Sequence, residues 1–90
     1  MKVIIYAKQN QPNSDVVKQL EVCQNFADFY DYEVVGVATE IDTLFTTSIE
    51  YDGVLVTQRS RISRSSYHYE EIKQDLLKMG VIIIEAVRTE

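Results

Sequence analysis

Four cationic side chains of this sequence are placed where they could bind an anion: Lys8, Arg59, Arg61 and Arg64. Lys8 follows the apolar segment 3–7, and the three arginines follow the apolar segment 54–57. The arginines precede or open a predicted helix, where the helix dipole disfavours cations by roughly a few tenths of a kcal/mol each. This placement predicts a bound phosphate or carboxylate. Arginines that are solvated, or paired with nearby carboxylates, are the alternative that the sequence leaves open.

The elements that would position these residues alternate between strand and helix. Apolar segments predict strands over residues 2–7, 34–38, 54–57 and 81–85. Ser14 or Asp15 can cap a helix that continues to about residue 30. A second helix is expected from about 65 to 79, ended by Gly80 in the C′ position. A short helix within residues 40–50 is favoured by the spacing of its apolar side chains, although its threonines and serine weaken it.

Helical spacing also predicts which side chains of the two long helices are buried. The expected apolar stripe of the first helix is Val16, Leu20, Cys23 and Ala27, and that of the second is Tyr69, Ile72, Leu76 and Met79. The strands are almost continuously apolar, which suits burial on both faces of a parallel sheet. We therefore expect a three-layer α/β domain with about four parallel strands in the flavodoxin-like order 2-1-3-4.

The expected strand order also predicts where a ligand would bind. In a sheet of order 2-1-3-4 the order reverses between the first and third strands, and ligands bind outside the carboxyl ends of the strands at that point. Lys8 leaves the first strand there, and Arg59, Arg61 and Arg64 leave the third. The four cations should therefore meet at one edge of the sheet.

Composition restricts the class of protein. The 90 residues suit a single domain over 1–90, and the net charge of −5 argues against strong autonomous DNA binding while allowing a local basic patch. One cysteine, Cys23, excludes an internal disulfide and fits a reducing compartment, so a cytoplasmic protein without signal peptide or membrane span is expected. No spacing of Cys, His or acidic residues suggests a metal site, and no cofactor is expected.

Several motifs, in order, carry a family resemblance. "YAKQN" is followed by "QLEVC" at the family's distance from Tyr6 to Gln19, and "DYEVVGV" comes next. The strand "DGVLV" leads to "SRISRS", and the chain continues with "LLKMGVIIIEAV". Together these segments resemble the N-terminal catalytic domain of a serine recombinase (resolvase/invertase) over nearly the whole chain, except around residues 40–51. The resemblance implies a resolvase-like fold.

The resemblance also implies a site that has been partly dismantled. The nucleophilic serine falls at Asn10, whose amide cannot attack a phosphodiester. Lys8 replaces an arginine, so it keeps the charge but loses bidentate phosphate geometry. Ser60 replaces an aspartate. The matching positions are Gln19, Arg61, Ser63 and Arg64, whereas a further arginine of the family, on the helix between the second and third strands, has no evident counterpart. The resemblance implies that the two matching arginines bind the scissile phosphate. The expected anion-binding residues are Lys8, Asn10, Gln19, Arg61 and Arg64, with no catalytic residue.

No other side chain is a strong substitute for the missing nucleophile. Ser14 is expected to be a helix cap, and Cys23 to be core packing. Ser60 and Ser63 lie among arginines but have no general base beside them in sequence. His68, the only histidine, is expected on the surface of the last helix.

Three functions are compatible with these observations. The leading hypothesis is a catalytically inactive recombinase-like domain that acts as a binding or regulatory module in DNA recombination or in mobile-element or phage biology. The family's long dimerising helix and separate DNA-binding region have no counterpart in these 90 residues, so a protein partner or a homo-oligomer is expected, with nucleic acid possible at the arginine edge. The alternatives are a phosphodiesterase or hydrolase of altered chemistry and a structural homo-oligomer. Tyr30, Tyr32, Tyr67 and Tyr69 could supply its interface or be partly buried against the core.

Overall fold

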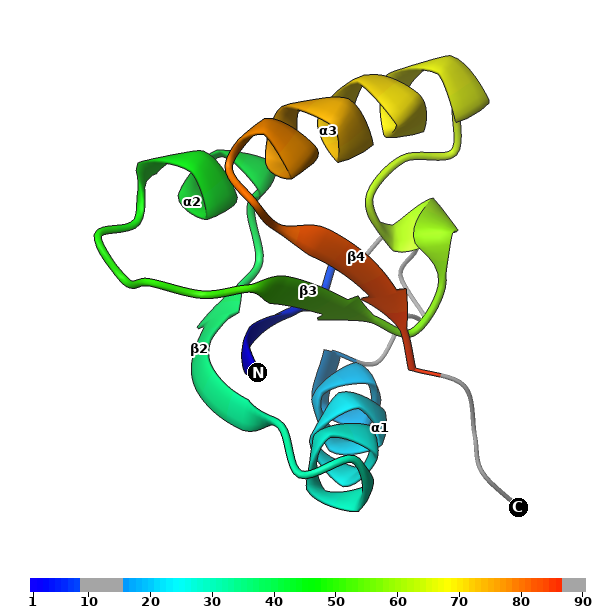
Figure 1. Cartoon of the computed structure of the whole chain (residues 1–90). Helices are drawn as coiled ribbons and strands as arrows, with labels where there is room; N and C mark the ends of the chain where they lie inside the picture. The colour runs from blue at the N-terminus through cyan, green and yellow to red at the C-terminus, as the bar shows by residue number, and fades with distance from the viewer. Residues whose placement is uncertain (9–15, 87–90) are drawn as a thin grey trace.

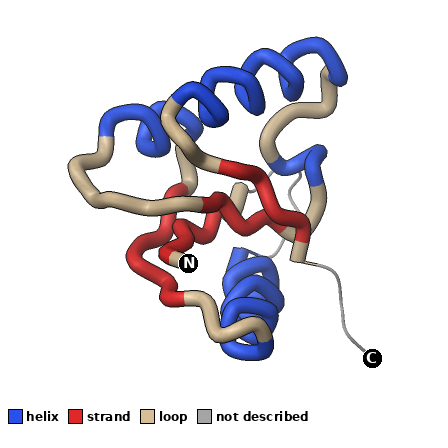
Figure 2. The backbone as a smooth tube through the Cα atoms, viewed as in Figure 1, coloured by secondary structure: helices blue, strands red, loops and turns tan. Residues whose placement is uncertain are grey.

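The computed structural model describes residues 1–8 and 16–86, and its elements alternate between strand and helix as predicted (Figures 1 and 2). In chain order they are β1 (Lys2–Tyr6), α1 (Val16–Phe29), β2 (Glu33–Ala38), α2 (Ile41–Thr46), β3 (Gly53–Val56), the 3-10 helix η1 (Arg59–Arg61), α3 (Ser66–Lys78) and β4 (Ile82–Glu85). The short helix expected within residues 40–50 is α2.

The four strands form one parallel sheet in the order β2-β1-β3-β4, which confirms the predicted topology. β1 pairs with β3 in the register Val3 to Gly53, and the register of β1 with β2 shifts between Val3 and Ile4. Figure 1 shows α1 on one face of the sheet and α2 and α3 on the other, so the domain has three layers. The α/β fold class expected from the sequence is therefore correct.

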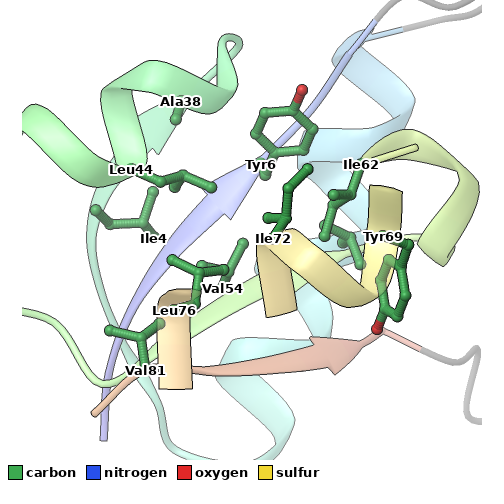
Figure 3. Close-up of a cluster of buried hydrophobic side chains, with 11 residues drawn as sticks. Ile4, Tyr6, Ala38, Leu44, Val54, Ile62, Tyr69, Ile72, Leu76 and Val81 are labelled. Carbon is green, nitrogen blue, oxygen red and sulfur yellow. The ribbon is translucent and has the colours of Figure 1, made fainter. Parts of the chain in front are cut away.

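Alternation along β1 divides the core into two halves. Ile4 and Tyr6 belong to the cluster beneath α2 and α3, whereas Val3 and Ile5 belong to the cluster beneath α1. Figure 3 shows the first of these clusters, with Tyr6 next to Ile72 of α3. Because successive side chains of a strand point to opposite faces, one strand anchors both layers.

The helix boundaries follow ordinary capping chemistry. The Ser65 hydroxyl accepts a hydrogen bond from the His68 amide at 3.3 Å, so Ser65 is the N-cap of α3. Gly80 has φ 79°, the left-handed conformation that ends the helix as predicted. Within the described residues no helix is long and apolar enough to cross a membrane.

Three burial expectations differ from the structure. On α1 the buried side chains are Gln19, Cys23 and Ala27, so Gln19 occupies the position expected for Leu20, which is only half-buried. Met79 is 48% exposed because α3 ends one residue earlier and the chain turns away. Val37 and Ile82 are also exposed, since β2 and β4 are the edge strands and are not covered on both faces as the central pair is.

Candidate anion-binding site

The site lies at the carboxyl edge of the sheet, where β1 and β3 end side by side. The Ala7 amide still donates to the Ala38 carbonyl at 3.0 Å, and the Ala86 amide donates to the Val56 carbonyl at 2.7 Å. Lys8 and Thr57 are the next residues along the two central strands. The segments that carry Lys8 and the arginines therefore leave the sheet from neighbouring strands at the point where strand order reverses.

Gln19 holds the backbone of Lys8 in place. Its Oε1 accepts a hydrogen bond from the Lys8 amide at 3.1 Å, and its Nε2 donates to the Lys8 carbonyl at 3.0 Å. Gln19 is only 4% exposed, and it is the one polar side chain buried in the core of the described residues. A buried amide requires such partners, and the backbone of Lys8 supplies two of them. Gln19 is thus a positioning residue, because it fixes the first residue after β1.

The 3-10 helix η1 positions the arginines of the second segment. The Arg61 amide donates to the Gln58 carbonyl, and the Ile62 amide donates to the Arg59 carbonyl, both at 3.0 Å. Ile62 is 4% exposed and anchors this turn in the core beneath α3. Arg61 is half-buried and Arg64 is exposed, so the two arginines differ in how firmly the fold holds them.

Arg59 does not contribute a free charge to the edge. Its Nε lies 2.5 Å from an oxygen of Glu85 at the end of β4, and its guanidinium carbon lies 5.9 Å from the centre of the Tyr69 ring. The hydrogen bond and charge of Glu85 raise the pKa of Arg59. For Arg59, the alternative of an arginine paired with a nearby carboxylate is therefore the correct one.

A shallow cavity of about 320 Å³ opens between η1 and the start of α3. Ser60, Ser63 and Arg64 line it, together with Tyr69 and Glu70. The Ser63 hydroxyl accepts a hydrogen bond from the Ser65 amide at 3.1 Å, which keeps the turn before α3 closed. Arg59 also lines this cavity but is paired with Glu85, whereas Arg64 is exposed and forms no ion pair with any residue that the structure describes.

Tyr6 is the buried polar group closest in sequence to Lys8. Burial, with a smaller contribution from the Glu40 carboxylate, raises the pKa of its hydroxyl to about 12. This hydroxyl and that of Thr57 are buried without a hydrogen-bond partner among the described residues. A phenol that is both enclosed and difficult to ionise is unsuited to act as a nucleophile in place of the missing serine.

The other reactive side chains considered from the sequence are buried, exposed on α3 or outside the described residues. Cys23 is fully buried and burial raises the pKa of its thiol to about 11, which agrees with a role in core packing. His68 is exposed on the first turn of α3, as expected. Asn10 and Ser14 lie outside the described residues. In the described ranges no group of three or more His, Cys, Asp or Glu side chains could hold a metal ion.

Sequence patterns did not identify three residues that shape this edge. Glu85 neutralises Arg59, Glu40 lies near the Tyr6 hydroxyl, and Tyr69 packs against the Arg59 guanidinium. All three come from segments distant in sequence from their partners, so no local spacing reports them. The strand order places the ends of β2, β3 and β4 at one edge of the sheet. This order is the only feature from which the presence of Glu40 and Glu85 at that edge could have been inferred.

Comparison with solved structures identifies the fold. The catalytic domain of ISC1926 TnpA, an IS607-like serine recombinase, superposes with a TM-score of 0.79 at 23% identity, over 99% of this chain and 72% of that one. The N-terminal catalytic domain of TP901-1 integrase gives a TM-score of 0.76 at 18% identity, over 96% of this chain and 77% of that one. The catalytic domain of IS1535 TnpA, also IS607-like, gives 0.70 at 21% identity, over 94% and 70%. No protein-family model and no curated protein matches the sequence.

These likenesses define the class of protein by its fold. The chain has the fold of the catalytic domains of serine recombinases, over nearly its whole length. The resemblance first indicated by short motifs is therefore confirmed at the level of three-dimensional structure. The fold alone does not define the activity of this chain, which depends on the residues of its site.

Proposed function

We propose that this chain is a catalytically inactive serine-recombinase-like domain that binds a nucleic-acid phosphate through Lys8, Arg61 and Arg64. In this proposal it acts in the cytoplasm as a binding or regulatory module in DNA recombination, within mobile-element or phage biology. Two further residues belong to the site. Asn10 would offer a neutral hydrogen-bonding side chain, and Gln19 holds the backbone of Lys8 by hydrogen bonds. A protein partner or a second copy of the chain supplies the affinity that one small site lacks.

The observation that carries the proposal is the retained cationic edge. Gln19 fixes Lys8 with two hydrogen bonds, and η1 holds Arg61 at the end of the neighbouring strand. Arg59 is paired with Glu85, whereas Arg64 is exposed and forms no ion pair with the described residues. A phosphate near Lys8, Arg61 and Arg64 would gain charge-assisted hydrogen bonds, which are about twice as strong as neutral ones.

The absence of catalysis follows from the identity of residue 10. A serine recombinase forms a covalent bond between a serine oxygen and a DNA phosphate, and the carboxamide of asparagine is not a nucleophile of that kind. Cys23 and Tyr6 are buried with raised pKa values, so neither offers a replacement. The edge also carries negative charge, because Glu70 lines the same cavity as Arg59 and Arg64, and this mixed charge favours reversible binding over tight binding.

Binding is tested by fluorescence anisotropy with a labelled short duplex DNA at low salt. We expect the double variant Arg61→Ala/Arg64→Ala to bind about tenfold or more weakly, since a hydrogen bond to a charged group is worth about 1.5–3 kcal/mol. The control is Lys73→Ala/Lys78→Ala, which removes the same charge from α3 outside the site. Equal losses in both double variants would show that only net charge matters, and would refute the proposed site.

Inactivity is tested separately by incubating the protein with DNA and separating the products under denaturing conditions. We expect no covalent protein–DNA adduct from the natural sequence. An adduct that survives denaturation would contradict the proposal that Asn10 ends the chemistry, whatever the result of the binding experiment.

A further inference from the structure

An exposed group of aromatic and acidic side chains lies where α1 ends and β2 begins. We define this aromatic–acidic surface by six consecutive residues: Asp28, Phe29, Tyr30, Asp31, Tyr32 and Glu33. Phe29 is 67% exposed and Tyr30 is 47% exposed, although both are large and apolar. Contiguous exposed aromatic residues commonly mark a place where another molecule binds.

The exposed rings of this surface pack against Phe26 and Tyr32, which are themselves partly buried against the core beneath α1. The Tyr30 ring centre lies 4.6 Å from that of Phe26, 5.0 Å from that of Phe29 and 5.9 Å from that of Tyr32. The Tyr30 and Tyr32 rings are stacked, with 23° between their planes. Mutual packing restricts the motion of these rings, while Phe29 and Tyr30 keep much of their surface exposed. The faces of aromatic rings carry negative partial charge.

The charge of the surface has one sign only. Asp28, Asp31 and Glu33 lie within it, and no Lys or Arg occurs from residue 19 to residue 53. α1 has no basic residue in its last turn, although the helix dipole makes that end negative and usually favours a cation there. Asp31 has φ 62°, a conformation for which glycine is the usual choice, and here it adds a further carboxylate.

The surface is distant from the proposed phosphate site. α1 runs antiparallel to the strands, so its C-terminal end lies at the amino edge of the sheet, and the cations lie at the carboxyl edge (Figure 1). Next to it, a cavity of about 650 Å³ at the amino ends of the strands is lined by three acidic side chains, Glu33, Glu50 and Asp52, and by one basic side chain, Lys2. Acidic side chains therefore outnumber basic ones beside the surface as well.

We propose that the aromatic–acidic surface binds an arginine-rich segment of a partner protein. A guanidinium can stack on the faces of Phe29 and Tyr30 while its N–H groups pair with Asp28 or Asp31, which is a combination that arginine makes better than lysine. An apolar partner would bury these carboxylates without compensation, and a nucleic acid would be repelled by them. Charge complementarity thus selects a basic peptide. The inference stands independently of the phosphate site.

The test uses isothermal titration calorimetry or fluorescence anisotropy with a labelled peptide that alternates arginine and glycine. The comparison peptide replaces every arginine by lysine. We expect the arginine peptide to bind more tightly, and we expect Phe29→Ala/Tyr30→Ala to weaken its binding about fivefold or more, since each cation–π contact is worth about 0.5–1 kcal/mol. Both side chains are exposed, so the fold should tolerate their removal.

Matched variants separate this surface from general effects of charge and exposed rings. Tyr67→Ala removes an aromatic side chain that is 77% exposed on α3, and it should leave binding unchanged. Asp28→Asn/Asp31→Asn should weaken binding, whereas Asp42→Asn/Glu71→Gln, with the same change in net charge elsewhere, should have a clearly smaller effect. Asparagine tolerates the positive φ of residue 31.

Three results would overturn the inference. The first is no binding of the arginine peptide at low salt, and the second is equal binding of the arginine and lysine peptides. The third is self-association, measured by analytical ultracentrifugation without peptide, that Phe29→Ala/Tyr30→Ala abolishes, because a second copy would then be the occupant of this surface.

Discussion

Replacing Gln19 by leucine would remove both hydrogen bonds that hold Lys8 at the end of β1. Leucine has a similar volume and would suit the apolar surroundings, so the main change is the loss of partners for the Lys8 amide and carbonyl. Each intramolecular hydrogen bond contributes about 1 kcal/mol, and a buried group left without a partner costs about 1–3 kcal/mol. Because Lys8 is only half-buried, water can partly replace the lost contacts.

We therefore expect Gln19→Leu to lower the free energy of unfolding by about 2 kcal/mol, which is about 1 kcal/mol for each of the two lost hydrogen bonds. The assay is equilibrium unfolding in urea, combined with hydrogen exchange at the Lys8 amide, which should lose protection. The control is Gln24→Leu, the same substitution on the exposed side of α1, where the side chain bonds only to Asp28. That variant should change stability by less than about 0.5 kcal/mol.

A Gln19→Leu protein as stable as the natural one, with Lys8 still protected, would refute the reasoning. It would mean that the backbone after β1 is held by other contacts. DNA binding should be measured without denaturant and well below the unfolding temperature. If stability falls but DNA binding is unchanged, the positioning role assigned to Gln19 in the phosphate site would be wrong, although its structural role would stand.

The other predictions concern the core, the thiol and the ion pair. Leu76→Ala should lower the free energy of unfolding by about 2–5 kcal/mol in urea titrations, because Leu76 is fully buried, while Leu77→Ala, at an exposed neighbour, should cost far less. Cys23 should react with a thiol reagent only when the protein unfolds. Because burial raises the pKa of its thiol from 9.0 to about 11 in the folded state, its contribution to stability is complete below pH 9 and falls as the pH rises from 9 to about 11. Cys23→Ala should therefore flatten the pH dependence of the free energy of unfolding between pH 9 and about 11. Glu85→Gln should release Arg59 and tighten DNA binding in the anisotropy assay, and unchanged or weaker binding would show that Arg59 faces away from the phosphate.

The fold was predictable from the sequence because its determinants are local and periodic. Continuous apolar segments, helix stops such as Gly80 and short connections together require parallel strands with helices between them, and chirality then limits the strand order. The exposure of apolar side chains on the edge strands was not predictable in the same way. Val37 and Ile82 stand in segments as apolar as β1 and β3, and only their place at the edges of the sheet exposes them.

The site shows the same division. The order of residues along the chain is enough to show which charged residues leave the central strands and that residue 10 is an asparagine. How those residues are used depends on the packing of the fold: Gln19 turns inward to bond the backbone of Lys8, and Glu85 neutralises Arg59. The physical reason is that side-chain pairing depends on distances between elements that are far apart along the chain. Residue identity decides what a group can do, whereas packing decides which partner it meets.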